Sequence, residues 1–230
     1  MNPQVDTTIY AASTWVVPVL IAITFHEAAH GFIAHRFGDD TAWRLGRVSF
    51  NPLKHVDPFG TILLPAFLLL AHAPFLFGYA KPVPVNFRAL RNPRRDMVWV
   101  AAAGPATNIL LATAAGLMVH LVGLLPPDAD RWVLQNLENA IVINVILAVF
   151  NMIPLPPLDG GRVAVGLLPD VFARPLAGLE RYGMLIIIGM LFVLPMLGRQ
   201  FGMDLNVLAW LIAGPANALI GAILQLTGNT

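Results

Sequence analysis

The chain consists of long apolar segments separated by short loops that contain most of its charged residues. Five segments are long enough to cross a bilayer as helices, which takes roughly 20 apolar residues each. They are Ile9 to Phe37, Met97 to Leu125, Leu137 to Pro154, Tyr182 to Leu197 and Val207 to Leu226. No internal repeat or low-complexity stretch is present. The pattern therefore predicts one all-α membrane domain over residues 1–230, a polytopic bundle of five to six transmembrane helices.

A sixth apolar run, Gly60 to Tyr79, is interrupted by prolines and differs from the other segments. The loops on either side of it, Arg36 to Asp57 and Lys81 to Arg95, are both rich in arginine and lysine, whereas Pro126 to Glu138 is acidic. Cytoplasmic loops carry the excess of basic residues. If both basic loops are cytoplasmic, the run between them must enter the membrane and return as a re-entrant or short segment. The alternative is a plain sixth crossing.

Composition agrees with a membrane protein. Hydrophobic residues make up 57% of the chain and charged residues only 12%, which exceeds the apolar content of a soluble domain. A net charge of +1 gives no reason to expect a nucleic-acid partner. Between Ala42 and Asn51, polar and apolar residues partly alternate around a central glycine. This alternation predicts a small β element near the membrane surface.

The most informative polar residues are His26, Glu27 and His30, which form the pattern His-Glu-Ala-Ala-His in the first apolar segment. Residues four apart lie on one face of a helix, so two imidazoles can bind one metal ion while the glutamate reaches a nearby water. Ionisable residues inside a membrane are costly and are usually functional. We predict His26 and His30 as metal ligands and Glu27 as the catalytic base. Mutual solvation of the three side chains is the alternative.

A catalytic zinc site also needs a third protein ligand. The chain has no cysteine, and His35 lies about 140° around the helix from His30, so it points elsewhere. Most acidic residues lie in polar loops. Asp159 instead follows the proline-interrupted end of an apolar helix and precedes two glycines, which permit close packing. With a re-entrant 60–79 run, Asp159 reaches the same leaflet as His30, so we predict it as the third ligand.

Three stretches resemble elements of one known family, the site-2 proteases, which are intramembrane zinc metalloproteases of peptidase family M50. His26-Glu-Ala-Ala-His30 resembles the metal motif of the family, and Asn151-Met-Ile-Pro-Leu-Pro-Pro-Leu-Asp-Gly160 resembles its second motif, in which the Asp is the third ligand. Gly104-Pro-Ala-Thr-Asn108 is similar to a third element. The chain lacks the inserted PDZ domain and the appended CBS domain of better-known members. It therefore resembles a minimal form.

The resemblance implies hydrolysis of a peptide bond in the transmembrane segment of a protein substrate, with one Zn²⁺ per chain. It also implies that Asn108 and Asn151 line the substrate cleft, although an equally good interpretation of Asn108 is that it ties helices together. We expect a catalytic core over about 9–165, accessory helices over about 180–226, and a location in the prokaryotic cell membrane with the site nearer the cytoplasm.

Two other classes of function are compatible with parts of the sequence. A metal or ion transporter would place ionisable residues on several helices, whereas here they concentrate at one site. An inactive membrane scaffold that retains the motifs has no need of a glutamate at position 27. Both alternatives fit the sequence less well than a metalloprotease in the lipid bilayer.

Overall fold

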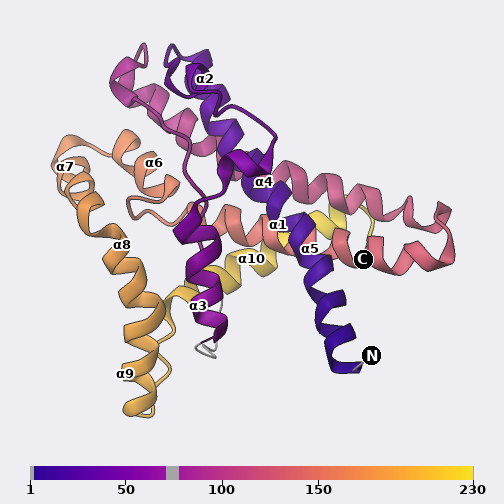
Figure 1. Cartoon of the computed structure of the whole chain (residues 1–230). Coiled ribbons are helices and arrows are strands. Elements are labelled where there is room, and N and C mark those ends of the chain that lie inside the picture. Colours follow the sequence, from indigo (N-terminus) through magenta and orange to yellow (C-terminus); the bar gives the residue numbers. More distant parts are fainter. Residues whose placement is uncertain (1–2, 71–77, 230) are drawn as a thin grey trace.

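The computed structural model describes residues 3–70 and 78–229, and this part of the chain contains helices and turns but no strand (Figure 1). The α-helices are α1 (Pro3–Arg36), α2 (Thr41–Arg44), α3 (Leu64–Leu70), α4 (Pro93–Val119), α5 (Pro127–Asn151), α6 (Asp159–Leu167), α7 (Asp170–Gly178), α8 (Glu180–Ile188), α9 (Leu194–Gln200) and α10 (Val207–Leu226). Short 3₁₀ or π turns are η1 (Pro52–His55), η2 (Pro58–Leu63), η3 (Phe87–Ala89), η4 (Val122–Leu124) and η5 (Gly189–Val193).

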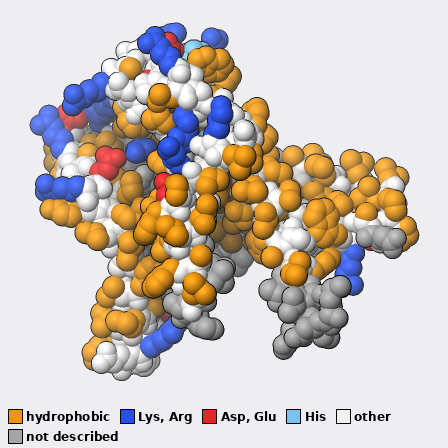
Figure 2. Space-filling view, in the orientation of Figure 1, with side chains coloured by type: hydrophobic (Ala, Val, Ile, Leu, Met, Phe, Trp, Pro, Cys, Tyr) orange, Lys and Arg blue, Asp and Glu red, His pale blue; other side chains and the backbone are white. Residues whose placement is uncertain are grey.

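Five helical segments are long and apolar enough to cross a membrane, as the sequence predicts. They are Ile9–Arg36, Pro93–Val119, Ala129–Asn151, Glu180–Gln200 and Val207–Leu226. Hydrophobic side chains cover much of the visible flanks of the molecule, whereas lysines and arginines gather around α2 and α7 (Figure 2). An apolar flank beside a basic end suits a helix bundle in lipid. The chain is therefore a multi-pass membrane protein.

The centre of the molecule is formed by α1, α4 and α5, which pack against one another. Helix α10 adds to this centre through a buried cluster of Ala112, Val145, Ala216 and Ile223. Two of these four residues are alanines, and small side chains let helices approach closely in lipid. The continuous segment α8–η5–α9 extends away from this centre (Figure 1).

Helix α5 begins at Pro127, ten residues before the predicted start at Leu137. Proline is well suited to the first turn of a helix, because its missing N–H would have no partner there. Two side chains in the first half of α5 also bond to α1. Trp132 Nε1 donates to Ser13 Oγ at 2.9 Å, and Asn139 Nδ2 donates to the carbonyl of Thr14 at 3.0 Å. The acidic stretch is therefore largely helical.

The predicted β element between Ala42 and Asn51 is wrong. Its first residues form α2, and the backbone groups that a strand would use are bonded locally. The Arg47 N–H donates to the carbonyl of Ala42 at 2.9 Å, and Lys54 Nζ donates to the carbonyl of Gly46 at 2.9 Å. The alternating pattern in the sequence does not show that these backbone groups find hydrogen-bond partners within the loop instead of on a second strand.

The run from Gly60 to Tyr79 is described only in part, because residues 71–77 lie outside the described residues. Its first half forms η2 and α3. The Tyr79 N–H donates to the carbonyl of Gly60 at 3.0 Å, and the Thr61 hydroxyl donates to the carbonyl of Tyr79 at 2.9 Å. These bonds place the beginning and the end of the run side by side.

Candidate metal centre

His26, His30 and Asp159 meet at a buried point where α1 faces the start of α6. The Nε2 atoms of His26 and His30 are 3.0 Å apart. Oδ2 of Asp159 lies 3.2 Å from Nε2 of His26 and 3.3 Å from Nε2 of His30. All three residues are buried. The two histidines are adjacent because they are four residues apart on one helix, and the proline-rich turn after α5 brings Asp159 to them.

The outer nitrogens of the two imidazoles are held by oxygen acceptors. Nδ1 of His26 lies 2.6 Å from Oδ1 of Asn108, and Nδ1 of His30 lies 2.7 Å from the carbonyl of Val100. An imidazole facing such an acceptor carries its proton on Nδ1, which leaves the lone pair of Nε2 free. Both Nε2 lone pairs therefore point at the Asp159 carboxylate.

Three electron-rich atoms face one another at this point, and a bound cation would stabilise them through coordination. Oδ2 of Asp159 is buried and receives no hydrogen bond. Two neutral imidazoles and one carboxylate form a common ligand set for catalytic zinc. The residues present therefore fit a Zn²⁺ ion.

Helix α4 covers the centre at Gly104, the first residue of the Gly-Pro-Ala-Thr-Asn element. A Cβ atom at this position would lie 2.5 Å from Cε1 of His26 and 2.5 Å from Nε2 of His30. Any side chain here would displace the imidazoles. On the other side of the centre, a Cβ atom at Gly160 would lie 2.2 Å from the carbonyl oxygen of Met152. This close approach agrees with the packing role predicted for the glycine pair.

Asn108 lies behind His26, and the structure gives its amide a complete set of partners. Besides its contact with His26, its Nδ2 donates to the carbonyl of Ala22 at 3.2 Å and to Oδ1 of Asn144 at 2.8 Å. Asn108 is 0% exposed. These contacts fit the helix-tying interpretation of Asn108, and they orient a metal-ligand candidate. Sequence reasoning did not identify Asn144 as part of this hydrogen-bond network. Its position seven residues before Asn151, on nearly the same helix face, was the available signal.

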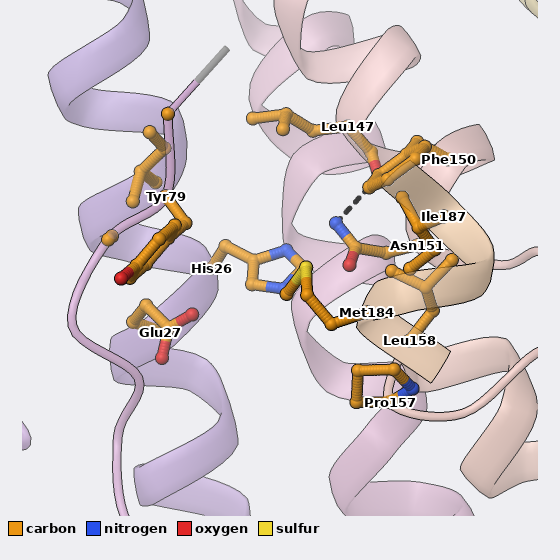
Figure 3. A pocket seen from close by; sticks show the side chains of 13 residues that line it. His26, Glu27, Tyr79, Leu147, Phe150, Asn151, Pro157, Leu158, Met184 and Ile187 are labelled. Carbon is orange, nitrogen blue, oxygen red and sulfur yellow. Dashed lines mark hydrogen bonds between the residues drawn. The ribbon is translucent and has the colours of Figure 1, made fainter. Parts of the chain in front are cut away.

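A cavity of about 210 Å³ opens beside His26 and contains Glu27 and Asn151 in its walls (Figure 3). Its other walls come from the segment 78–80, the turn before α6, and Met184 and Ile187 of α8. Asn151 is tied to its own helix, since its Nδ2 donates to the carbonyl of Leu147 at 3.0 Å. Asn151 therefore borders the cavity, whereas Asn108 is not among the residues that line it, and the contact of either amide with substrate stays a prediction.

Two further positions differ in how readily the sequence reveals them. His35 points away from the centre, as its helical angle predicts, because it stacks on Trp43 at 4.4 Å and its Nδ1 lies 2.7 Å from Oδ1 of Asp40. The Val100 carbonyl that holds His30 was not predicted. A backbone carbonyl has no side-chain signature, so no sequence signal could have identified it.

Comparisons with known proteins agree with this geometry. The family model described as "Peptidase family M50" matches residues 117–196, which include Asp159. A Bacillus subtilis (strain 168) protein named "Putative zinc metalloprotease YwhC" is 39% identical over 185 residues, which cover 79% of this chain and 80% of the relative. A Mycolicibacterium smegmatis protein named "Putative zinc metalloprotease Rip2" is 30% identical over 216 residues, covering 90% of this chain and 77% of the relative. No solved structure matches the chain significantly. The chain belongs to peptidase family M50.

Proposed function

We propose that this protein is an intramembrane zinc metalloprotease that hydrolyses a peptide bond in the transmembrane segment of a protein substrate. The observation that carries this function is the convergence of His26, His30 and Asp159 beside a cavity that also contains Glu27. The names of the relatives add zinc and proteolysis to this geometry. The reaction class is therefore metal-assisted hydrolysis of an amide.

His26, His30 and Asp159 would hold one Zn²⁺ ion, which when bound supplies Lewis acidity toward the scissile carbonyl. Glu27 follows His26 directly, and both line the cavity. As a general base, its carboxylate takes the proton of the attacking water and passes it to the leaving amine. Asn151 borders the same cavity and would donate its amide to a substrate carbonyl. Asn108, which is buried and does not line the cavity, is assigned to the orientation of His26.

The size of the cavity sets a condition on the substrate. A helix with side chains is about 10–12 Å across, whereas the cavity measures about 210 Å³. A substrate helix must therefore unwind locally, so that one extended stretch with few side chains enters. Unwinding also exposes the scissile carbonyl, which is otherwise bonded within the helix.

The proposed orientation in the cell membrane follows from charge. The basic end of the molecule lies around α2 and α7 (Figure 2), and basic residues favour the cytoplasmic side. His26 and His30 lie in the half of α1 that leads to this end, so the site is nearer the cytoplasm. The contact between Gly60 and Tyr79 supports a re-entrant run between two cytoplasmic loops.

The orientation is open to a direct test because the chain has no cysteine. Single cysteines at Ser49 and Asn92 should react with an impermeant thiol reagent only from the cytoplasmic side. A cysteine at Gly123, an exposed turn residue, should react only from outside. Labelling of Asn92 from outside would make the run from Gly60 to Tyr79 a true crossing and contradict the proposed topology.

One observation favours a protease over a transporter. In the part of the chain that the structure describes, His26, His30 and Asp159 are the one group of three ionisable residues placed to hold a metal. A permeation path would need further sites along the membrane normal. The proposed unit is the whole chain, with the catalytic core over about 9–165 and the helices over about 180–226 as accessory elements.

The test uses detergent-purified protein loaded with zinc and a panel of single-span reporter proteins tagged on both sides of one transmembrane segment. We expect cleavage within that segment by the wild type. Glu27→Gln should keep about one zinc per chain but abolish cleavage, because the base is lost while the ligands remain. Cleavage by Glu27→Gln at the wild-type rate would refute the assignment of the base.

A further inference from the structure

The segment 78–86 runs beside the metal-binding helix and contacts Glu27 through its backbone. The Val83 N–H donates to Oε2 of Glu27 at 2.7 Å. The neighbours of Val83 are Pro82 and Pro84, which have no N–H. Val83 is therefore the only residue of the 82–84 stretch that can donate a backbone hydrogen bond, and it donates to the candidate base.

A second carboxylate of the same region holds the same segment. Asp39 follows α1 and is 0% exposed, and its Oδ2 accepts the Asn86 N–H at 2.6 Å. Its Oδ1 accepts the N–H of Thr41 at 2.9 Å and the hydroxyl of Thr41 at 2.5 Å. The buried carboxylate of Asp39 thus accepts hydrogen bonds from Thr41 in its own loop and from Asn86 in the segment 78–86.

These two contacts attach the segment to α1 and to the loop after it at positions only three residues apart. Between Asn86 and Val83 lies Pro84, whose fixed φ limits the freedom of the short connection. On the N-terminal side of Val83, the carbonyl of Lys81 accepts a hydrogen bond from the Arg47 guanidinium at 2.9 Å. The Lys81 N–H donates to the carbonyl of His55 at 2.9 Å. The position of the Val83 N–H is therefore set by polar contacts on both sides of it.

The bond to Glu27 has a chemical consequence. A hydrogen bond to a carboxylate is charge-assisted and stronger than one between neutral groups. It fixes one oxygen, Oε2, and with it the direction in which the other oxygen points. Glu27 is only partly buried, so without this donor its side chain could adopt other rotamers. Misplacement of a catalytic group by about 1 Å can cost on the order of 100-fold in rate.

We propose that Asp39 is a positioning residue for catalysis, which acts through Asn86 and Val83 to hold the carboxylate of Glu27 in its working orientation. The proposal rests on the proposed function, because it assigns Glu27 as the base. A positioning role for Asp39 and a merely structural role make different predictions. A structural role predicts loss of folding or metal, whereas a positioning role predicts slower turnover by a folded, zinc-loaded protein.

Asp39→Asn is the sharpest variant. It leaves one side-chain oxygen for the donors of Thr41 and Asn86 and places an amide NH₂ opposite one of them, so it weakens the attachment of the segment through Asp39. Asp40→Asn is the matched control, since Asp40 is the next residue but is exposed enough to pair with His35 and Arg44. Thr41→Val is a second control, because it removes only the hydroxyl bonded to Oδ1 of Asp39.

Two readouts are compared on the zinc-loaded, full-length protein. Amide hydrogen exchange of a peptide covering 81–87 should accelerate about 10-fold or more at Val83 and Asn86 in Asp39→Asn, because the Asn86 N–H loses its acceptor and the released segment no longer holds the Val83 N–H against Glu27. With a single-span reporter that the wild type cleaves, kcat should fall about 10- to 100-fold. KM and zinc content should stay near the wild-type values. Asp40→Asn and Thr41→Val should match the wild type in exchange and kcat.

Three outcomes would overturn the proposal: unchanged exchange in Asp39→Asn, faster exchange with unchanged kcat, or equal loss of kcat in Asp40→Asn. If Asp39→Asn does not fold, Asn86→Pro removes the same bond from the donor side. Asn86→Ala is its control, since it keeps the N–H. A zinc-loaded wild type that cleaves none of the reporters would instead refute the proposed function, while the exchange data would still decide whether Asp39 holds Val83.

Discussion

The inner helices α1, α4 and α5 and the outer segment α8–η5–α9 are held in different ways, although α1, α5 and α8 border the same cavity. In the most apolar part of each span, 33% of Pro93–Val119 is buried, against 17% of Glu180–Gln200. The inner helices also share polar contacts deep in the bundle, through Asn108 and Asn139. Buried hydrogen bonds between helices fix their rotation as well as their distance.

This difference separates two tasks. The inner helices contain or support the candidate metal ligands, whose relative positions must vary little for a metal to be held, and satisfied polar networks are rigid. The outer segment supplies one wall of the cavity, through Met184 and Ile187, and faces lipid with most of its other side chains. We therefore expect changes in the inner region to affect metal and turnover, and changes in the outer region to affect substrate choice.

The largest effect should come from removing a ligand. Asp159→Ala should lose both zinc and activity, because two imidazoles alone leave the site without its charge-neutralising carboxylate. Zinc content after dialysis and cleavage of a single-span reporter are the measurements. Asp170→Ala is the control, an exposed acid of α7 that pairs with Arg94. Full zinc binding by the Asp159 variant would assign the third ligand to another residue.

A slightly smaller effect is expected at Gly104. In Gly104→Ala, the new methyl group would overlap the imidazoles of His26 and His30, which cannot move without losing their contacts. Zinc affinity should fall by on the order of 100-fold or more, as measured by competition with a chelator. Gly214→Ala in α10 is the control, because its methyl group would meet nothing within 4 Å. Equal affinity in both variants would remove the argument that α4 shapes the site.

Removal of the support behind His26 should cost less than loss of a ligand. Asn108→Ala leaves the ring of His26 without its acceptor, so we expect zinc affinity to fall about 10- to 100-fold. Asn151→Ala provides the contrast within the same region, since Asn151 borders the cavity and its Nδ2 donates to the carbonyl of Leu147 on its own helix. It should lower reporter cleavage while zinc affinity stays constant. The reverse pattern would exchange the roles assigned to the two amides.

The smallest effect should come from the outer wall. Met184→Ala widens the cavity without touching a ligand, so it should change the relative kcat/KM of two reporters by about 10-fold or less. Zinc affinity and the cleavage of a small-residue reporter should be little altered. Leu185→Ala is the matched control, because Leu185 is the next residue but is 67% exposed on the lipid side. A loss of zinc in Met184→Ala would show that the outer segment also supports the centre.

The sequence was sufficient for the spanning helices and for the three ligand candidates, because both depend on side chains. Apolar length predicts a crossing, and the spacing of His26 and His30 places them on one helix face. Asp159 could be found because a carboxylate after a proline-broken helix has few other uses. These features are local, and each follows from residue type and position alone.

The features of the fold and the site that were not predicted depend on contacts between residues that are distant in the sequence or on backbone groups. Acidic residues before Leu137 resembled a loop, but they continue α5 because Trp132 and Asn139 bond to α1. The alternation after Ala42 resembled a strand, but its backbone carbonyls accept hydrogen bonds from nearby residues of the same loop. The carbonyl of Val100 and the N–H of Val83 are backbone groups, which every residue possesses. Sequence patterns cannot distinguish them from their neighbours.

Zinc K-edge X-ray absorption of the purified protein examines directly whether His26, His30 and Asp159 bind one zinc ion. We expect about one zinc per chain with nitrogen and oxygen ligands at about 2.0–2.2 Å and scattering from two imidazoles. In His30→Ala, one imidazole should disappear from the spectrum of whatever zinc remains. A wild-type spectrum without imidazole scattering, or a protein that binds no zinc, would show that these three residues do not form a zinc site.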